Sequence, residues 1–153
     1  MKPGSIDTLV AAAPAATAET ATTDRRDPHE VFLIEDDLVV SRLVTHLLTR
    51  RGYTVQHAAD GLRAIEILGA SRKPAVVLLD VMLPYVNGFE LMSRIRSTPG
   101  WQDVPVLILT SKSHESDILR AFDSGANDYM VKPFRPEEFV ARVRRLADAR
   151  RAA

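Results

Sequence analysis

The sequence predicts an α/β protein built on a doubly wound, five-stranded parallel sheet with helices on both faces. Two observations carry this prediction. From residue 30 onward, short apolar runs alternate with longer stretches in which apolar residues recur at three- and four-residue steps, the rhythm of alternating strands and helices. The runs PAVVLLD and VPVLILT are too continuously apolar to be half exposed, which is typical of central parallel strands covered on both faces.

The first half of this pattern predicts two strands, each followed by a helix. Val31–Asp37 is an apolar run that ends in acidic residues, and Gly52 supplies the stop signal of the helix after it. The expected buried stripe of that helix is Val40, Leu43, Val44, Leu47 and Leu48. Residues 53–58, YTVQHA, alternate with polar residues, as suits an edge strand. The expected inward residues of the next helix, in DGLRAIEILGA, are Leu62, Ala64, Ile65 and Leu68.

The second half predicts three more strands, each followed by a helix. After PAVVLLD comes a helix in NGFELMSRIRS, with the expected inward residues Phe89, Met92 and Ile95. Val104–Thr110 is a buried strand, and the short helix in HESDILRAFDSG closes at Gly125. DYMVK is the fifth strand. In the last helix, Pro136 and two glutamates suit the first turn, and the expected buried stripe is Phe139, Val143 and Leu146.

The composition favours one compact domain. The chain has 153 residues, of which 46% are hydrophobic, enough for a proper core. Twenty basic residues balance twenty acidic ones, so no strong field draws the protein towards nucleic acid or an anionic membrane. The apolar runs are too short to span a bilayer as helices, and the lack of cysteine fits a reducing compartment. We expect a soluble cytoplasmic protein without direct nucleic-acid or membrane contact.

Residues 1–28 differ from the rest of the chain. They are rich in Ala and Thr and offer little bulky apolar surface, so we interpret them as a flexible tail and assign residues 29–153 to the domain. A signal peptide is the alternative for this segment. Asp7 and Pro14 interrupt its weakly apolar stretch and only Lys2 supplies a positive side chain, which favours the tail.

Polar residues follow four of the predicted strands, at the point where each strand ends. Right-handed crossovers bring the carboxyl ends of parallel strands to one edge of the sheet, where ligands bind. The residues expected there are Glu35, Asp36, Asp37, Asp80, Thr110 and Lys132. Neighbouring carboxylates raise one another's pKa unless a cation shares their charge. Because the available ligands are oxygen atoms, the sequence predicts Mg²⁺ at this edge.

Asp80 beside a magnesium ion has the chemistry of a nucleophile towards phosphorus. Its carboxylate would form an aspartyl phosphate while the metal neutralises charge on the incoming phosphoryl group. Thr110 would donate a hydrogen bond to one phosphoryl oxygen, and Lys132 would pair with another as a compact charge. Asp37 we interpret as the N-cap of the first helix rather than a ligand.

Four segments make the sequence resemble the receiver domains of bacterial two-component response regulators. They are FLIEDD, VVLLDVMLPYVNGFEL, VLILTS and GANDYMVKPF, in the family's order and spacing within about residues 30–148. The resemblance implies a CheY-like, flavodoxin-like fold with strand order 2-1-3-4-5. It also implies a metal-binding acidic pair in Glu35 and Asp36, a phosphoacceptor in Asp80, and a backbone carbonyl ligand from Met82.

The same resemblance implies a phosphorylation switch. Thr110 matches the switch hydroxyl of the family, Tyr129 the switch aromatic, Lys132 the phosphate-binding lysine, and Pro133 the proline after a cis peptide bond. A histidine kinase or histidine phosphotransfer protein would phosphorylate Asp80. A downstream protein target would then read a changed surface of the fourth helix, fifth strand and fifth helix. We expect a stand-alone regulator, and the formation of a homodimer on phosphorylation is left open.

The residues two positions after Asp80 and Thr110 bear on the lifetime of the phosphoryl group. In the family, side chains at these places control how water reaches the acyl phosphate. Met82 offers no hydrogen bond to orient water, and Lys112 could cover the phosphate. We therefore expect slow self-hydrolysis, and a signalling phosphoacceptor rather than an enzyme.

The sequence leaves three alternatives to a final output regulator. The chain could pass the phosphoryl group on as a phosphorelay intermediate, or it could act as a binding scaffold independent of phosphorylation. A small Mg²⁺-dependent phosphatase of the haloacid-dehalogenase type also uses a strand-end Asp as nucleophile. That class requires a second Asp two residues later as acid/base, where this chain has Met82, so we place it last.

Overall fold

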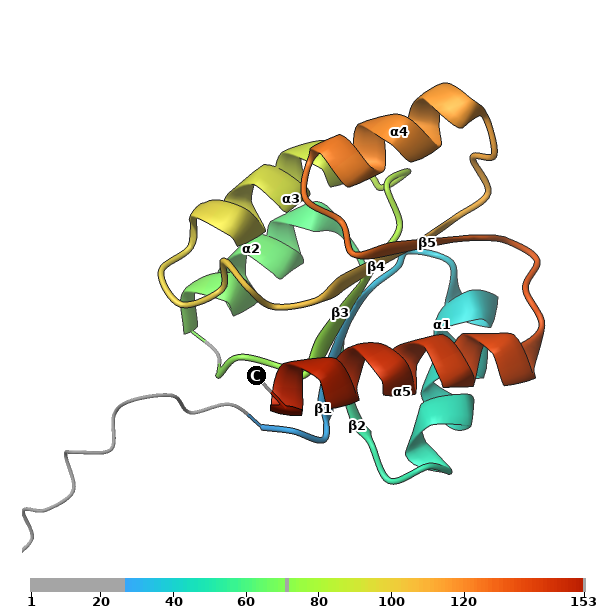
Figure 1. Ribbon diagram of the computed structural model, residues 1–153. Helices are drawn as coiled ribbons and strands as arrows, with labels where there is room; N and C mark the ends of the chain where they lie inside the picture. The colour runs from blue at the N-terminus through green and yellow to red at the C-terminus, as the bar shows by residue number, and fades with distance from the viewer. Residues whose placement is uncertain (1–26, 71, 153) are drawn as a thin grey trace, which may run out of the picture.

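The computed structural model describes residues 27–70 and 72–152, in which strands and helices alternate along the chain (Figure 1). The strands are β1 (Glu30–Ile34), β2 (Thr54–Ala58), β3 (Val76–Leu79), β4 (Val106–Thr110) and β5 (Asp128–Val131). The helices are α1 (Leu38–Thr49), α2 (Gly61–Ala70), α3 (Gly88–Ser97), α4 (Glu115–Asp123) and α5 (Pro136–Ala152). Most of the expected tail, residues 1–28, lies outside the described residues, so that assignment stays a prediction.

The strands form one parallel sheet in the order β2-β1-β3-β4-β5, which confirms the expected fold class and strand order. The chain starts near the middle of the sheet, winds outward to β2, and crosses back to β3 before it continues to β5. The winding therefore reverses between β1 and β3, which pair in register from Val31 with Val76 to Ile34 with Leu79. In open α/β sheets, ligands bind outside the carboxyl ends of the strands at such a reversal.

Two apolar layers cover the sheet, because successive strand side chains point to opposite faces. Phe32 and Ile34 pack with α2, α3 and α4, whereas Val31 and Leu33 pack with α1 and α5. Figure 1 shows the same division, with α1 and α5 on one side of the sheet and the other three helices on the opposite side. The core thus fixes every strand between two layers and leaves the strand ends to carry polar groups.

Two apolar residues that the periodicity placed inside are on the surface. Leu43 of α1 is 41% exposed and Leu62 of α2 is 55% exposed, so the expectation that they are buried was wrong. Small residues occupy the inward positions beside them. Ser41 is buried in α1, and a Cβ on Gly61 would lie 2.5 Å from the Cβ of Val86. At Ser41 and Gly61 a small residue allows the helix to pack closely, and apolar periodicity does not detect such a contact.

Local hydrogen bonds fix where two of the helices begin. The Asp37 carboxylate accepts from the backbone N–H groups of Val39 and Val40, which confirms it as the N-cap of α1. Asn87 caps α3 in the same way through the N–H of Phe89. After α1, Gly52 adopts a φ of 90°, a left-handed conformation that favours glycine.

Within the described residues, no helix combines the length and the apolar character needed to cross a membrane.

Gly88, the first residue of α3, lies so close to the loop after β3 that it has no room for a side chain. A Cβ there would overlap the Val81 Cα and lie 2.9 Å from the Asp80 carbonyl oxygen. We predict that Gly88→Ala lowers the free energy of unfolding by about 1–3 kcal/mol, because backbone atoms must move. Chemical denaturation measures this loss.

Gly69→Ala is the matched control, because a Cβ on this glycine of α2 meets no atom within 4 Å. Its expected effect is a gain of about 1 kcal/mol from the higher helix propensity of alanine. Equal effects of the two substitutions would contradict the close contact at Gly88.

Candidate functional site

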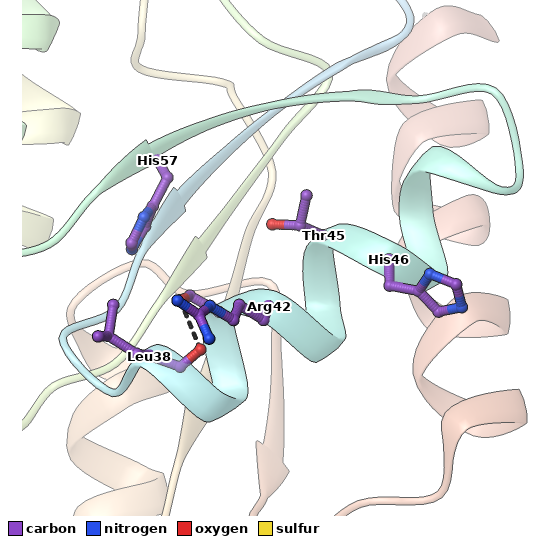
Figure 2. A pocket seen from close by; sticks show the side chains of 6 residues that line it. Leu38, Arg42, Thr45, His46 and His57 are labelled. Atoms are coloured by element: carbon purple, nitrogen blue, oxygen red, sulfur yellow. Dashed lines mark hydrogen bonds between the residues drawn. The ribbon is translucent and has the colours of Figure 1, made fainter.

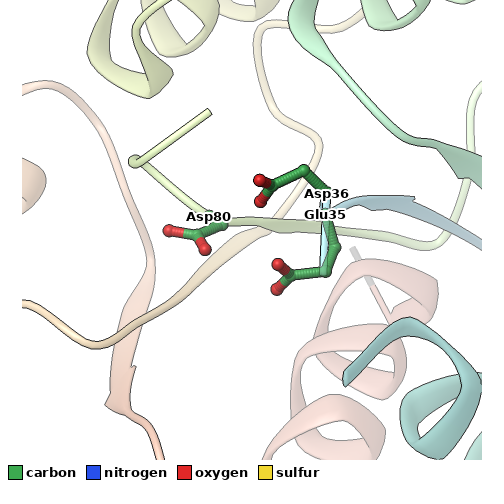
Figure 3. A group of neighbouring side chains, drawn as sticks. All are labelled: Glu35, Asp36 and Asp80. Atoms are coloured by element: carbon green, nitrogen blue, oxygen red, sulfur yellow. The ribbon is translucent and has the colours of Figure 1, made fainter. Parts of the chain in front are cut away.

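Three carboxylates gather at the carboxyl ends of β1 and β3, where the winding of the sheet reverses. Glu35 and Asp36 follow β1, and Asp80 follows β3. One carboxylate oxygen from each lies within 4.8 Å of the others, close enough to hold one metal ion (Figure 3). Glu35 and Asp80 are buried, whereas Asp36 is exposed at the opening.

Lys132 places an ammonium group between two of these carboxylates. Its Nζ donates to Glu35 Oε1 at 2.7 Å and to Asp80 Oδ2 at 2.9 Å. Lys132 directly follows β5, and its backbone N–H donates to the Thr110 carbonyl oxygen at 2.9 Å. The peptide bond from Lys132 to Pro133 is cis. The ends of β1, β3 and β5 are thus joined through one charged side chain.

Burial and charge act in opposite directions on the pKa values of this cluster. Burial raises the pKa of Glu35, and the hydrogen bond from Lys132 offsets part of that effect. For Lys132, burial alone would lower the pKa, but the hydrogen bonds to Glu35 and Asp80 more than compensate and the pKa is raised. The lysine is therefore held as a cation.

The remaining bonds of the acidic residues orient their oxygens. Glu35 Oε2 accepts from the Asp37 N–H at 3.1 Å, and Asp80 Oδ1 accepts from the Met82 N–H at 2.9 Å. Both bonds run to backbone two residues later, so they fix each side chain against its own loop. Ordered carboxylates of this kind suit a metal or a phosphoryl group, because little reorganisation is needed on binding.

Thr110, the last residue of β4, has an unsatisfied hydroxyl group. Thr110 is fully buried. Among the side chains that the structure describes, its Oγ1 is the buried oxygen or nitrogen atom that lacks a hydrogen-bond partner. Leaving such a group unpaired costs about 1–3 kcal/mol. A ligand oxygen bound at the strand ends would offer it an acceptor.

Tyr129 of β5 is buried and joins β5 to the loop after β4. Its hydroxyl donates to the Lys112 carbonyl oxygen at 2.7 Å. Burial raises the pKa of this phenol, and the negative charges of Asp117 and Asp80 raise it further. The hydroxyl therefore stays protonated and serves as a donor.

The opening beside Asp80 is a cleft of about 490 Å³, lined by Asp36, Met82, Tyr85, Lys112 and their neighbours. The Ser111 hydroxyl lies 3.6 Å from the Met82 Sδ. Tyr85 is 79% exposed and adopts a φ of 70°, a conformation that is rare for a residue with a large side chain. Rare backbone conformations persist where the surrounding structure imposes them.

A second, smaller pocket of about 370 Å³ lies between α1 and β2, lined by Leu38, Ser41, Arg42, Thr45, His46 and His57 (Figure 2). His57 connects it to the acidic cluster, because its Nε2 lies 2.7 Å from the Glu35 carbonyl oxygen. The described part of the chain has no histidine in the group of potential metal ligands. His57 thus supports the end of β1 without entering the metal-ligand group.

Sequence reasoning found most of this site and missed three of its members. The structure brings Glu35, Asp36, Asp80 and Lys132 together, and Thr110, Met82 and Tyr129 lie on the elements and loops around them. Sequence reasoning did not assign His57, Tyr85 or Asp117 to the site. The alternation of YTVQHA marks a strand but not the contact that His57 makes, and no local pattern indicates a positive φ at a tyrosine.

The fold is a doubly wound α/β sheet that carries an acidic cluster where its winding reverses, and the comparisons identify the family. The response regulator receiver domain matches residues 31–144, so the chain belongs to that family. The transcriptional regulator RpaA of Synechocystis sp., described as DNA-binding, is 43% identical over 76% of this chain and 48% of its own length. The response regulator MprA of Mycobacterium ulcerans is 40% identical over 76% of this chain and 49% of its own length. The chain spans about half the length of these relatives.

Solved structures agree with this membership. A response regulator from Chloroflexus aurantiacus is similar with a TM-score of 0.73 and 35% identity, covering 80% of this chain and 99% of its own. The receiver domain of the sensor histidine kinase PA1611 from Pseudomonas aeruginosa is similar with a TM-score of 0.72 and 29% identity, covering 78% and 98%. That structure has a magnesium ion coordinated in the active site cleft.

The paired ammonium of Lys132 should be important for folding as well as for the site. We predict that Lys132→Met lowers the free energy of unfolding by about 3 kcal/mol, because Glu35 and Asp80 would stay buried without a counter-charge. Urea denaturation at neutral pH measures the loss. The matched control is Lys112→Met, which removes a 41% exposed ammonium and should cost under about 1 kcal/mol. Equal losses of unfolding free energy in the two variants would show that the buried pairing stabilises the fold no more than the exposed one.

Proposed function

We propose that this receiver domain accepts a phosphoryl group on Asp80 from a phosphohistidine of a histidine kinase or histidine phosphotransfer protein. The observation that carries the proposal is the convergence of three carboxylates, one ammonium and the unsatisfied Thr110 hydroxyl on one opening. Each group matches a need of phosphoryl transfer, which depends mainly on positioning and on neutralising charge.

The transfer itself is one displacement at phosphorus. A carboxylate oxygen of Asp80 forms a bond to phosphorus while the bond from phosphorus to the imidazole nitrogen of the donor breaks. The electron pair of the broken bond stays on that nitrogen. Lys132 Nζ, which lies 2.9 Å from Asp80 Oδ2, stabilises the charge on the transferred oxygens. The hydroxyl of Thr110 gains an acceptor.

The donor set fits Mg²⁺. Glu35, Asp36 and Asp80 offer carboxylate oxygens within 4.8 Å of one another, and magnesium prefers one or two carboxylates with carbonyl and phosphate oxygens. These three residues and the Met82 carbonyl would hold the ion. When bound, it supplies positive charge that offsets the charge of the phosphoryl group. The magnesium-bound receiver from Pseudomonas aeruginosa supports this proposal.

We further propose that phosphorylation acts on the surface formed by α4, β5 and α5. Thr110 and Lys132 are drawn to the phosphoryl oxygens, and Tyr129 follows the loop that holds its hydroxyl bond. Leu119 and Phe122 of α4 are 56% and 45% exposed, so this helix presents apolar side chains that a protein target could cover. Arg142 and Arg145 pair with Asp128, which attaches α5 to β5 and lets both elements respond together.

Some aspects of the protein's role stay predictions. RpaA is described as DNA-binding but is matched over only 48% of its length, so the lack of direct nucleic-acid contact in this protein is a prediction. A cytoplasmic location, a relay role and the formation of a homodimer on phosphorylation are also predictions. The small phosphatase is the least favoured alternative, because Met82, and not an acid, stands two residues after Asp80.

Phosphate uptake tests the proposal directly. We predict that the wild-type chain with Mg²⁺ gains one acid-labile, base-labile acyl phosphate from acetyl phosphate or from candidate kinases. Asp80→Asn should gain none, because the amide is not a nucleophile at phosphorus. Intact-mass measurement reports the added group, and EDTA should abolish uptake. Thr110→Ala is the companion variant, expected to accept phosphate but to bind a phosphorylation-dependent target less tightly.

Three results would decide against the proposal. Uptake by Asp80→Asn at the wild-type rate would move the phosphoacceptor elsewhere. No uptake by the wild type from any donor would favour the binding scaffold. Turnover of p-nitrophenyl phosphate at enzyme-like rates would favour the phosphatase.

A further inference from the structure

The ammonium group of Lys112 lies between the Asp80 cleft and the first turn of α4. The side chain lines the cleft together with Asp36 and Met82. Its Nζ also lies 4.0 Å from Asp117 Oδ1. The Lys112 side chain is 41% exposed, so it has room to adopt another rotamer. The ammonium thus has one anionic partner outside the cleft.

The groups around this ammonium are better fixed than the ammonium itself. The carbonyl of Lys112 is held by the Tyr129 hydroxyl at 2.7 Å, and Tyr129 is buried. The Asp117 side chain is only 20% exposed, and its backbone N–H donates to the His114 carbonyl oxygen at 3.0 Å. The backbone on both sides of the ion pair is thus anchored, and the Lys112 side chain is the more exposed of the two partners.

We propose that Asp117 is a positioning residue that holds the Lys112 ammonium away from phosphorylated Asp80 and thereby shortens the lifetime of the phosphoryl group. The inference rests on the proposed phosphorylation of Asp80. A phosphoryl group brings a charge of about −1.5 to −2 into the cleft and so competes with Asp117 for the ammonium. The carboxylate of Asp117 lowers the fraction of molecules in which Lys112 turns to the phosphate.

The chemistry of hydrolysis explains why this fraction matters. The oxygen of a water molecule forms a bond to phosphorus while the bond from phosphorus to the Asp80 oxygen breaks. The electron pair returns to the carboxylate, and the water loses a proton to solvent as inorganic phosphate leaves. The water must arrive in line with the breaking bond, from the open cleft. An ammonium bound to the phosphoryl oxygens on that side obstructs the approach.

The experiment uses the full chain, phosphorylated with acetyl phosphate and Mg²⁺ and then freed of donor. The half-life of the acyl phosphate is followed by intact mass. Asp117→Asn should lengthen it about two- to fivefold, the range that a half-exposed ion pair supports. Glu115→Gln is the matched control, because it removes a charge from the same first turn of α4, and its half-life should equal that of the wild type.

A double substitution separates this role from a structural effect on α4. In the Lys112→Met background, Asp117→Asn should leave the half-life unchanged, since no ammonium remains to be released. An unchanged or shorter half-life in Asp117→Asn alone would overturn the inference. The same lengthening with and without Lys112 would overturn it too, because Asp117 would then act through the helix. Failure of the wild type to take up any phosphate is a different result, which removes the proposed function itself.

Discussion

The pairing of one buried ammonium with two buried carboxylates is the constraint on which the site depends. Glu35 and Asp80 are 1% and 6% exposed, and a carboxylate at such a place is costly unless a cation shares its charge. Lys132 meets both at hydrogen-bond distance. With Asp36 added, three carboxylates still face one ammonium, and this excess of negative charge is what favours a divalent cation over a second lysine.

The unsatisfied hydroxyl of Thr110 lowers the stability of the fold at the same strand ends. A buried polar group without a partner is destabilising, and the described part of the chain has this one among its side chains. Its neighbour across the sheet, Val131, adjoins Lys132, so a shift of Thr110 towards a ligand would also move the end of β5. The Tyr129 hydroxyl is bonded to the loop after β4, so the proposed switch would act on Tyr129 through this hydrogen bond.

The sequence predicted the strands, helices and strand-end residues because each of these depends on short-range pattern. Apolar runs mark the strands, and parallel winding alone brings Asp80 and Lys132 to one edge. The strand order needed the family resemblance. Contacts between distant side chains were not predictable, because periodicity does not say which neighbour a residue meets. Leu62 is exposed since Gly61 packs against Val86, and His57 reaches the Glu35 carbonyl from another strand.

Lys132 and Lys112 differ in how tightly their ammonium groups are held. The Lys132 side chain is only 16% exposed and has two partners within 2.9 Å, so its position is fixed in the structure without a bound phosphoryl group. Lys112 is 41% exposed and has one partner at 4.0 Å. On the proposed function, a substitution at Lys132 is expected to disturb folding and transfer together, whereas one at Lys112 or Asp117 alters a weak pairing at the surface. If Asp80 is the phosphoacceptor, as proposed, the lifetime of its phosphoryl group could be adjusted at Lys112 and Asp117 without loss of the ability to accept it.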